Sequence, residues 1–201
     1  MNKLQKTAKG IDTILKISYW ANIAAAVLLG ILIFNIWRVY GAMPDISEAT
    51  SVVLDFGLIE FTVDPSAAHN QHAFIYHMCA SSLIPFAQVI FWCMFIRCGR
   101  KILAPMIENR PFHNQMADQL HRMGWLNIGL GIVDNLGELF LFGNLIPGYD
   151  LDALFANDMI LGYEYSISWD FRFLLWSAVL FLLSYVFKHG WELQQLSDET
   201  L

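Results

Sequence analysis

The sequence predicts an all-α membrane protein: a four-transmembrane-helix bundle with a small extracytoplasmic antiparallel β cap at one end. Three observations lead to this fold class. Hydrophobic residues make up 56% of the chain and charged residues only 15%, whereas about 25% of the residues of a soluble domain are charged. Four stretches are apolar over about 20 residues, the length of helix that crosses a bilayer core. Lysine and arginine concentrate in alternate segments between these stretches, as expected for loops on one side of a membrane.

The four expected spans follow one another along a single membrane domain, residues 1–201. They cover residues 17–37, 74–96, 124–146 and 171–187. Outer loops are expected at 41–73 and 147–170, and an inner loop at 97–122. The first span carries no charge, and the second has His77 as its strongly polar residue. The third contains Asp134 and Glu138, and the fourth begins beside Arg172, whose long side chain can reach the polar interface.

The distribution of basic residues predicts the orientation of the chain. Ten of the twelve Lys and Arg residues fall within 1–16, 97–122 and 188–201, and the other two, Arg38 and Arg172, stand at span ends. The outer loops instead hold ten of the eighteen acidic residues. Because cytoplasmic loops carry an excess of Lys and Arg, we expect a multi-pass protein with both termini in the cytoplasm.

The two outer loops each contain a segment that is typical of a β-strand. Residues 52–64 are rich in β-branched and aromatic side chains, and residues 160–169 alternate between large and small or polar side chains. A strand without a neighbour exposes its backbone groups. We therefore expect the two segments to pair with each other into an antiparallel sheet that caps the outer ends of the helices. The alternative is two separate ordered loops.

The inner loop is expected to be largely helical. Residues 101–109 continue the helix of the second span despite Pro105, and the Asn109-Arg110-Pro111 sequence ends it, because proline disfavours helix in the residue before it. A further short helix is expected to begin near Asn114 and to run into the third span.

The third span carries the polar and ionisable residues that are the strongest candidates for a binding site. Asn127, Asp134 and Glu138 fall on one face of a helix. An ionised carboxylate within a bilayer is costly, so it usually faces a bundle interior or a water-filled cavity. One interpretation is a proton-titrating or cation-binding site. The other is structural, with hydrogen bonds to polar groups of neighbouring helices such as Gln88, Ser81, Ser82 or His77. The candidate binding residues are Asp134, Glu138, Asn127, His77 and Arg172.

Several classes of function receive no support from the sequence. The net charge of −6 argues against a nucleic-acid partner, which requires a basic face. No nucleotide-binding, hydrolase or zinc-protease motif is present, so we expect no enzyme, no catalytic residue and no cofactor. His69 and His72 have a metal-ligand spacing without a third ligand nearby, so no metal site is expected. The three cysteines are interpreted as reduced packing residues.

Three short segments carry a resemblance to a known family. They are the strand-like Leu54–Val63, the stretch Asn109-Arg110-Pro111-Phe112 to Leu120-His121-Arg122-Met123-Gly124, and the tail Val186–Gln194. Together they resemble the bacterial membrane proteins grouped under domain of unknown function 2975, over most of the chain. The sequence departs from that pattern at Ser184-Tyr185, where Ala-Glu is usual, and at His113, where Thr is usual. The resemblance implies a four-helix bacterial inner-membrane protein, often encoded beside a small helix-turn-helix regulator, and it implies no activity or catalytic residue.

These observations together favour a non-enzymatic membrane protein with a binding or regulatory role. Its expected partners are the lipid bilayer and another membrane or cytoplasmic protein, with a second copy of the chain as a further candidate. One alternative is a proton- or cation-coupled transport component that uses Asp134 and Glu138. Another is a protein that binds a lipid or other apolar ligand between the cap and the helices.

Overall fold

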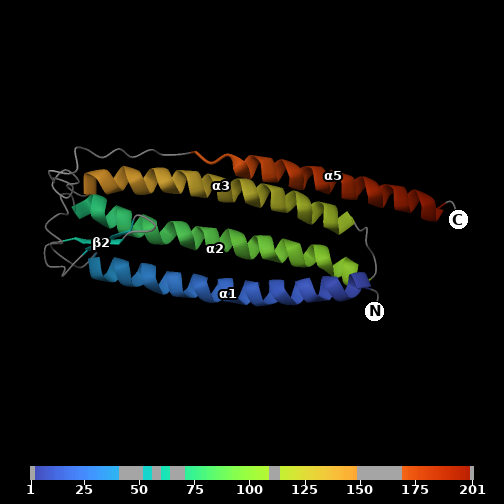
Figure 1. Ribbon diagram of the computed structural model, residues 1–201, viewed down its shortest axis with the longest axis horizontal. Coiled ribbons are helices and arrows are strands. Elements are labelled where there is room, and N and C mark those ends of the chain that lie inside the picture. Colours follow the sequence, from blue (N-terminus) through green and yellow to red (C-terminus); the bar gives the residue numbers. More distant parts are fainter. Residues whose placement is uncertain are drawn as a thin grey trace. The chain divides into compact units, whose positions relative to one another are not determined.

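The computed structural model describes residues 3–40, 52–55, 60–63, 71–108, 114–148 and 169–199. Within them lie four helices and one pair of strands (Figure 1). The helices are α1 (Lys3–Tyr40), α2 (Gln71–Ile107), α3 (Asn114–Gly148) and α5 (Arg172–Glu199), and the strands are β1 (Val52–Asp55) and β2 (Glu60–Val63).

The chain divides into two compact units. Unit 1 comprises Met1–Leu28, Phe86–Asp134 and Asp170–Leu201, and unit 2 comprises Leu29–Pro85 and Asn135–Trp169.

Three of the helices are long and apolar enough to cross a membrane. The qualifying stretches are Gln5–Val39 in α1, Cys79–Ile107 in α2 and Arg172–Ser197 in α5. Each helix also extends beyond the span predicted for it. With 38 residues, α1 is about 57 Å long at 1.5 Å per residue, against a bilayer core of about 30 Å. The chain is therefore a membrane protein whose helices continue past the apolar layer.

The expectation of four apolar spans is wrong, because only α1, α2 and α5 contain a stretch long and apolar enough to cross a membrane among the described residues. Its length is sufficient at 35 residues. The window predicted there, 124–146, contains Asn127, Asp134, Asn135 and Glu138, together with five glycines. The leucine and isoleucine residues between these polar and small residues made the segment look more apolar than it is. The all-α class itself is confirmed, since the other described elements are helices.

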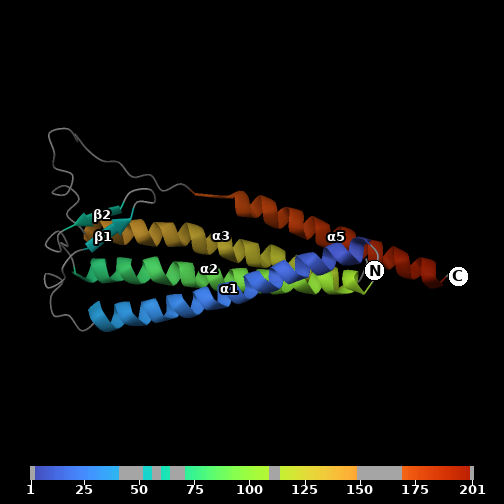
Figure 2. The same cartoon turned by 60° about the horizontal axis from the view of Figure 1, so that its bottom comes forward.

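The predicted β cap built from both outer loops is also wrong. β1 pairs with β2 in an antiparallel hairpin, with Val52 opposite Val63 and Asp55 opposite Glu60 (Figure 2). Both strands lie within 41–73, the segment expected to be the first outer loop. The second predicted strand, 160–169, lies outside the described residues except for Trp169. Pairing two strands that are four residues apart in sequence costs less chain entropy than pairing segments about one hundred residues apart. The sheet that forms is consequently local.

The inner connection follows the sequence expectation. α2 continues through Pro105 to Ile107, and α3 begins at Asn114. Pro105 stands within the last turn of α2, where its missing backbone N–H and its ring disturb only the end of the helix. The prediction that the chain breaks between these two helices near Asn109 is confirmed.

Unit 1 is held together by antiparallel packing of α1 on α2, α2 on α3 and α3 on α5. At two of these interfaces a glycine of α3 lies directly against an aromatic ring. Gly129 faces Phe91 of α2, and Gly131 faces Phe173 of α5. Because glycine has no Cβ, the helix backbones approach more closely there than larger residues would permit. In unit 2, Gly137 makes the corresponding approach to Ile84 of α2.

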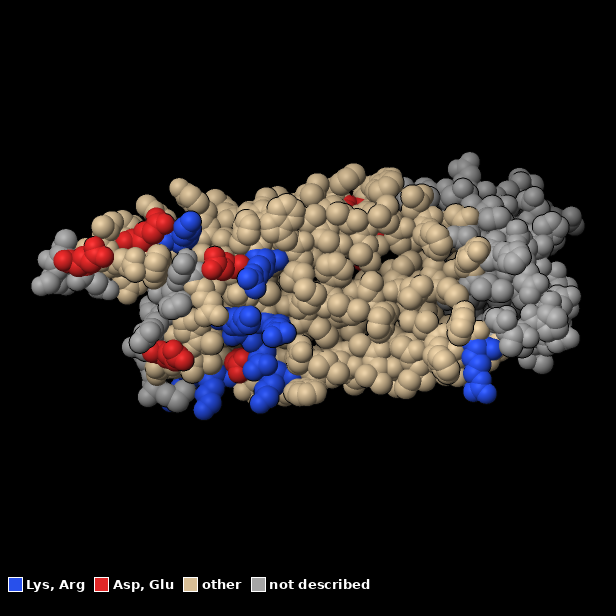
Figure 3. All heavy atoms as spheres, turned by 180° about the vertical axis from the view of Figure 1, so that it is seen from behind, with Lys and Arg blue, Asp and Glu red and all other residues tan. Residues whose placement is uncertain are grey.

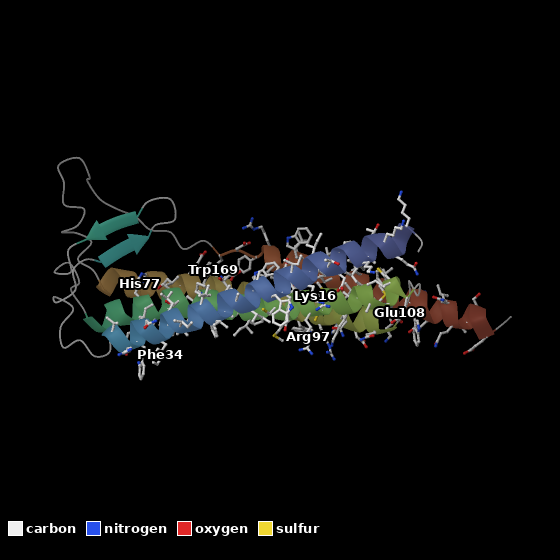
Figure 4. All side chains as sticks on the ribbon, turned by 90° about the horizontal axis from the view of Figure 1, so that it is seen from below. Lys16, Phe34, His77, Arg97, Glu108 and Trp169 are labelled. Atoms are coloured by element: carbon white, nitrogen blue, oxygen red, sulfur yellow. The ribbon has the colours of Figure 1, made fainter. Side chains whose placement is uncertain are left out.

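Many large apolar side chains are exposed, although a small set of apolar residues such as Ile96, Met116 and Leu120 is buried. Large apolar side chains are outside, such as Trp20 at 61% and Leu28 at 67% exposed, and Phe34 projects away from the helices (Figure 4). No residue of the apolar window in α1 is buried. The buried polar and charged residues among those described are Ser82, Gln119, Asn135, Ser177 and Ser184. This pattern fits a hydrocarbon environment, where apolar surface faces lipid and polar groups must be satisfied internally.

Candidate functional site

A polar stripe runs along one face of α3. Asn127, Gly131, Asp134 and Glu138 are spaced by four, three and four residues, so their Cβ positions stack along the same side of the helix. We call these four residues the α3 stripe. It contains three of the five candidate binding residues expected from the sequence.

Asn127 joins α3 to α5. Its Nδ2 atom donates hydrogen bonds to the backbone oxygen of Phe173, at 2.8 Å, and to Oγ of Ser177, at 3.0 Å. The Ser177 side chain is only 1% exposed. Both amide hydrogens of Asn127 are thereby used at a buried contact, where an unpaired polar group would be costly. Asn127 therefore acts as a polar clamp between two helices.

Asp134 joins α3 to α2. Its Oδ1 atom accepts a hydrogen bond of 2.8 Å from Nε2 of Gln88, and both side chains are partly buried. Gln88 is one of the four polar residues that the structural interpretation named as candidate partners. The contact therefore links α3 to α2 through one polar side chain of each helix.

Glu138 differs from the other members of the stripe because its side chain is exposed. It lies one turn beyond Asp134 on α3. Large apolar residues on the same helix are exposed as well, including Leu136 at 53% and Phe140 at 51%. No ion pair or hydrogen bond joins the Glu138 carboxylate to another residue in the described part of the chain. Within the described residues, the Glu138 carboxylate is thus exposed and makes no polar contact.

His77 and Arg172 have separate local partners. Nδ1 of His77 lies 3.3 Å from the backbone oxygen of Leu141. Arg172 is exposed and forms a two-pronged contact with Asp170, with Nη2 2.7 Å from Oδ2 and Nε 2.9 Å from the same oxygen. His77 and Arg172 were both expected to bind a ligand. In the structure, polar atoms of each side chain contact another residue of the chain instead.

Asp170 also begins α5 by capping it. Its Oδ1 atom accepts the backbone N–H of Arg172 at 2.8 Å, the side-chain contact that is typical of a helix N-cap. The hydrogen bonds from the Arg172 side chain and backbone lower the pKa of the Asp170 carboxyl from its ordinary value of 3.8. The carboxyl is therefore charged at neutral pH, and α5 has a defined start at the polar boundary.

Two helix contacts were not foreseen from the sequence. Ser184 Oγ donates a 2.7 Å hydrogen bond to the backbone oxygen of Ala117, as a second polar link between α5 and α3. Arg100 Nε of α2 lies 2.8 Å from Oδ1 of Asp12 in α1. Two features of the sequence could have indicated these contacts. Ser177 and Ser184 are seven residues apart within an apolar stretch, and α1 contains a single acidic residue, Asp12.

The polar contacts described above hold neighbouring helices together. Asn127, Asp134 and Ser184 each connect α3 to a neighbouring helix. Within the part of the chain that the structure describes, no three His, Cys, Asp or Glu side chains are placed to hold a metal ion. His69 lies outside that part. Among the buried side-chain polar atoms, Gln119 Oε1 is the one left without a hydrogen-bond partner in the described residues.

Comparison with known proteins gives no relative. No family model matches the chain, and neither a curated protein nor a solved structure matches it. The helix contacts and the exposed groups of this chain are therefore the basis for assigning a function.

Proposed function

We propose that this chain is a non-enzymatic, multi-pass protein of the bacterial cytoplasmic membrane that serves as a binding or regulatory subunit for another protein. The observation that carries the proposal is the use of the polar groups on the α3 stripe. Asn127 and Asp134 bond to α5 and α2, so they hold the helices together, whereas Glu138 points out of the packed helices. Glu138 places an exposed carboxylate on α3 beside exposed apolar side chains, and such a surface is suited to recognition by another protein.

The basic residues support an orientation with both chain ends at the cytoplasmic face. Arg38 of α1 belongs to unit 2, and the basic residues in the first half of α1, at the end of α2 and at the start of α3 belong to unit 1. They include Lys9, Lys16, Arg100 and Arg122. The positive-inside rule assigns such a cluster to the cytoplasm. The bacterial origin and a relation to domain of unknown function 2975 rest on the motifs set out from the sequence.

Photo-crosslinking in intact cells tests the proposed role. A photoreactive amino acid replaces Leu136 of α3 or, as a matched control, Trp20 of α1, both of which are exposed apolar residues. We expect position 136 to give a discrete protein adduct and position 20 to give lipid adducts alone. A tagged second copy identifies adducts of the chain with itself. Lipid adducts alone at both positions would contradict a partner-binding role.

A second candidate, proton or cation binding in a transport component, is favoured by the two carboxylates on the α3 stripe. Asp134 is partly buried and Glu138, one turn away, is exposed. A pair of this kind can pass a cation between an accessible and a sheltered position, because each carboxylate supplies oxygen ligands and negative charge. Three apolar helices are few for a transporter, so this role would require further subunits.

Flux measurements in proteoliposomes decide this second candidate. If the carboxylates carry protons or cations, the double substitution D134N/E138Q should lower flux at least tenfold. The matched control is D170N, which removes an exposed carboxylate at the start of α5. Equal flux in wild type, D134N/E138Q and D170N would exclude a role for the two stripe carboxylates in transport.

A further inference from the structure

The helix register in unit 1 brings basic residues of α2 and α3 to one place. Gln88 bonds to Asp134, and Phe91 lies against Gly129, so each step forward along α2 is a step backward along α3. Continuing this antiparallel register places Arg122 of α3 opposite residues 98–100 of α2, between Arg97 and Lys101. The cluster thus arises from how the two helices pack, because Arg122 stands more than twenty residues from α2's basic residues in sequence.

Three cations of α2 and α3 act electrostatically on the buried Cys98 at this level. Arg97 and Lys101 are four residues apart on α2, and the side chains of both, together with that of Arg122, lie within electrostatic range of the Cys98 sulfur. Arg97 and Arg122 are exposed and Lys101 is partly exposed. Figure 3 shows Lys and Arg gathered toward one end of the described surface, and Figure 4 marks Arg97. We call Arg97, Lys101 and Arg122 the basic triad.

The charge of the basic triad is not neutralised within the described residues. The neighbouring Arg100 is paired with Asp12 at 2.8 Å, whereas no ion pair to a described acidic residue is formed by a triad member. Asp118 stands one turn before Arg122 on α3, but the two make no ion pair. Like charges at a four-residue spacing repel one another. An anion bound between α2 and α3 would relieve this repulsion.

The surroundings of the triad indicate that the anion belongs to a lipid. Trp125 follows Arg122 by one turn and is 60% exposed, and Met94 precedes Arg97 and is 48% exposed. The Trp125 ring is held by a 3.2 Å hydrogen bond to His121 and an edge contact with Phe181. A cation followed by an ordered tryptophan and then apolar surface matches the order of headgroup, interface and acyl chain in a bilayer.

We propose that Arg97, Lys101 and Arg122 form a binding site for the phosphate of an anionic phospholipid, whose acyl chains lie along the exposed apolar surface of α2 and α3. This site is independent of the partner-binding role proposed above. The bound lipid bridges two helices, so it also stabilises their packing at the basic end. Each cation near an anionic surface strengthens binding by about fivefold.

Lipid retention tests the site. The whole protein is placed in nanodiscs with equal amounts of phosphatidylglycerol and phosphatidylcholine, extracted gently, and the retained lipids are quantified by native mass spectrometry. We expect wild type to retain phosphatidylglycerol preferentially, and R97Q/K101Q/R122Q to lose this preference by tenfold or more. The matched control K6Q/K9Q/K188Q removes three exposed cations of unit 1 and should keep it. The charge-preserving R97K/R122K should keep it as well.

Two results would overturn the proposal. If R97Q/K101Q/R122Q and K6Q/K9Q/K188Q lose the preference for phosphatidylglycerol equally, only the total positive charge of the protein matters. A free phosphate group is the other source of the same chemistry, so thermal unfolding is also measured in pure phosphatidylcholine nanodiscs with added inorganic phosphate. Stabilisation there as large as that by phosphatidylglycerol would show that a soluble anion is the ligand. Helix content and monodispersity are checked for every variant, and R97K/R122K distinguishes lost charge from lost folding.

Discussion

The Gly131→Ala variant is expected to unfold at a temperature several degrees below that of the wild-type chain. A Cβ atom at residue 131 would lie 2.6 Å from the Cβ of Phe173, far inside the favourable carbon–carbon distance of about 3.5–4.0 Å. The Phe173 Cβ is fixed to its backbone, so rotation of the ring cannot remove the clash. α3 and α5 must separate, and overpacking of this kind costs about 1–3 kcal/mol.

The matched control for this substitution is Gly143→Ala on the same helix. A Cβ at residue 143 meets nothing within 4 Å, and alanine is favoured over glycine in a helix by about 1 kcal/mol. Gly143→Ala should therefore leave the unfolding temperature unchanged or raise it slightly. Differential scanning fluorimetry in detergent measures both variants. Equal unfolding temperatures for the two would show that the α3–α5 contact at Gly131 is not close in solution.

The Asn127→Leu variant is expected to lose about 1–2 kcal/mol of unfolding free energy. The substitution removes the donor to Ser177 Oγ and to the Phe173 carbonyl, and a buried group left without its partner costs about 1–3 kcal/mol. Hydrogen bonds between membrane helices are individually weaker, at about 0.6 kcal/mol on average. Two bonds are lost together here, which brings the expected effect to the stated range. Unfolding by detergent titration measures it.

The control for Asn127 is another asparagine in an apolar helix. Asn35 of α1 is exposed and bonds to the backbone oxygen of Ile31 within its own helix, at 2.9 Å, so Asn35→Leu should change stability little. Combining Asn127→Leu with Ser177→Ala should cost less than the sum of the single changes, because each removes one side of the same contact. Strictly additive losses would mean that the two residues do not interact.

The ends of a helix could be predicted from the sequence where a short local motif determines them. Asn109-Arg110-Pro111 predicts the end of α2, and the structure ends that helix at Ile107. The number of apolar spans and the strand pairing of the cap were not predicted correctly. Counting apolar residues overrated α3, whose Asn127, Asp134 and Glu138 reduce its apolarity, and strand character in 52–64 did not reveal that the segment pairs with itself.

The candidate site shows the same division. Helical spacing by itself places Asn127, Asp134 and Glu138 on one face of α3. That spacing does not say which neighbour each residue meets. Asp134 meets Gln88 of α2 and Asn127 meets Ser177 of α5, while Glu138 remains exposed. Periodicity within one helix thus predicts a shared face, and only the packing of helices determines which groups are paired.

Composition alone determines that this chain belongs in a membrane, because 56% hydrophobic and 15% charged residues exceed what the interior of a domain of this size can bury. Local residue order likewise determines the helix break near Asn109. The helix neighbours, the clamp at Asn127 and the basic triad depend on contacts between residues distant in sequence. Such contacts follow from the close approach of backbones at Gly129 and Gly131, which no property of a single segment specifies.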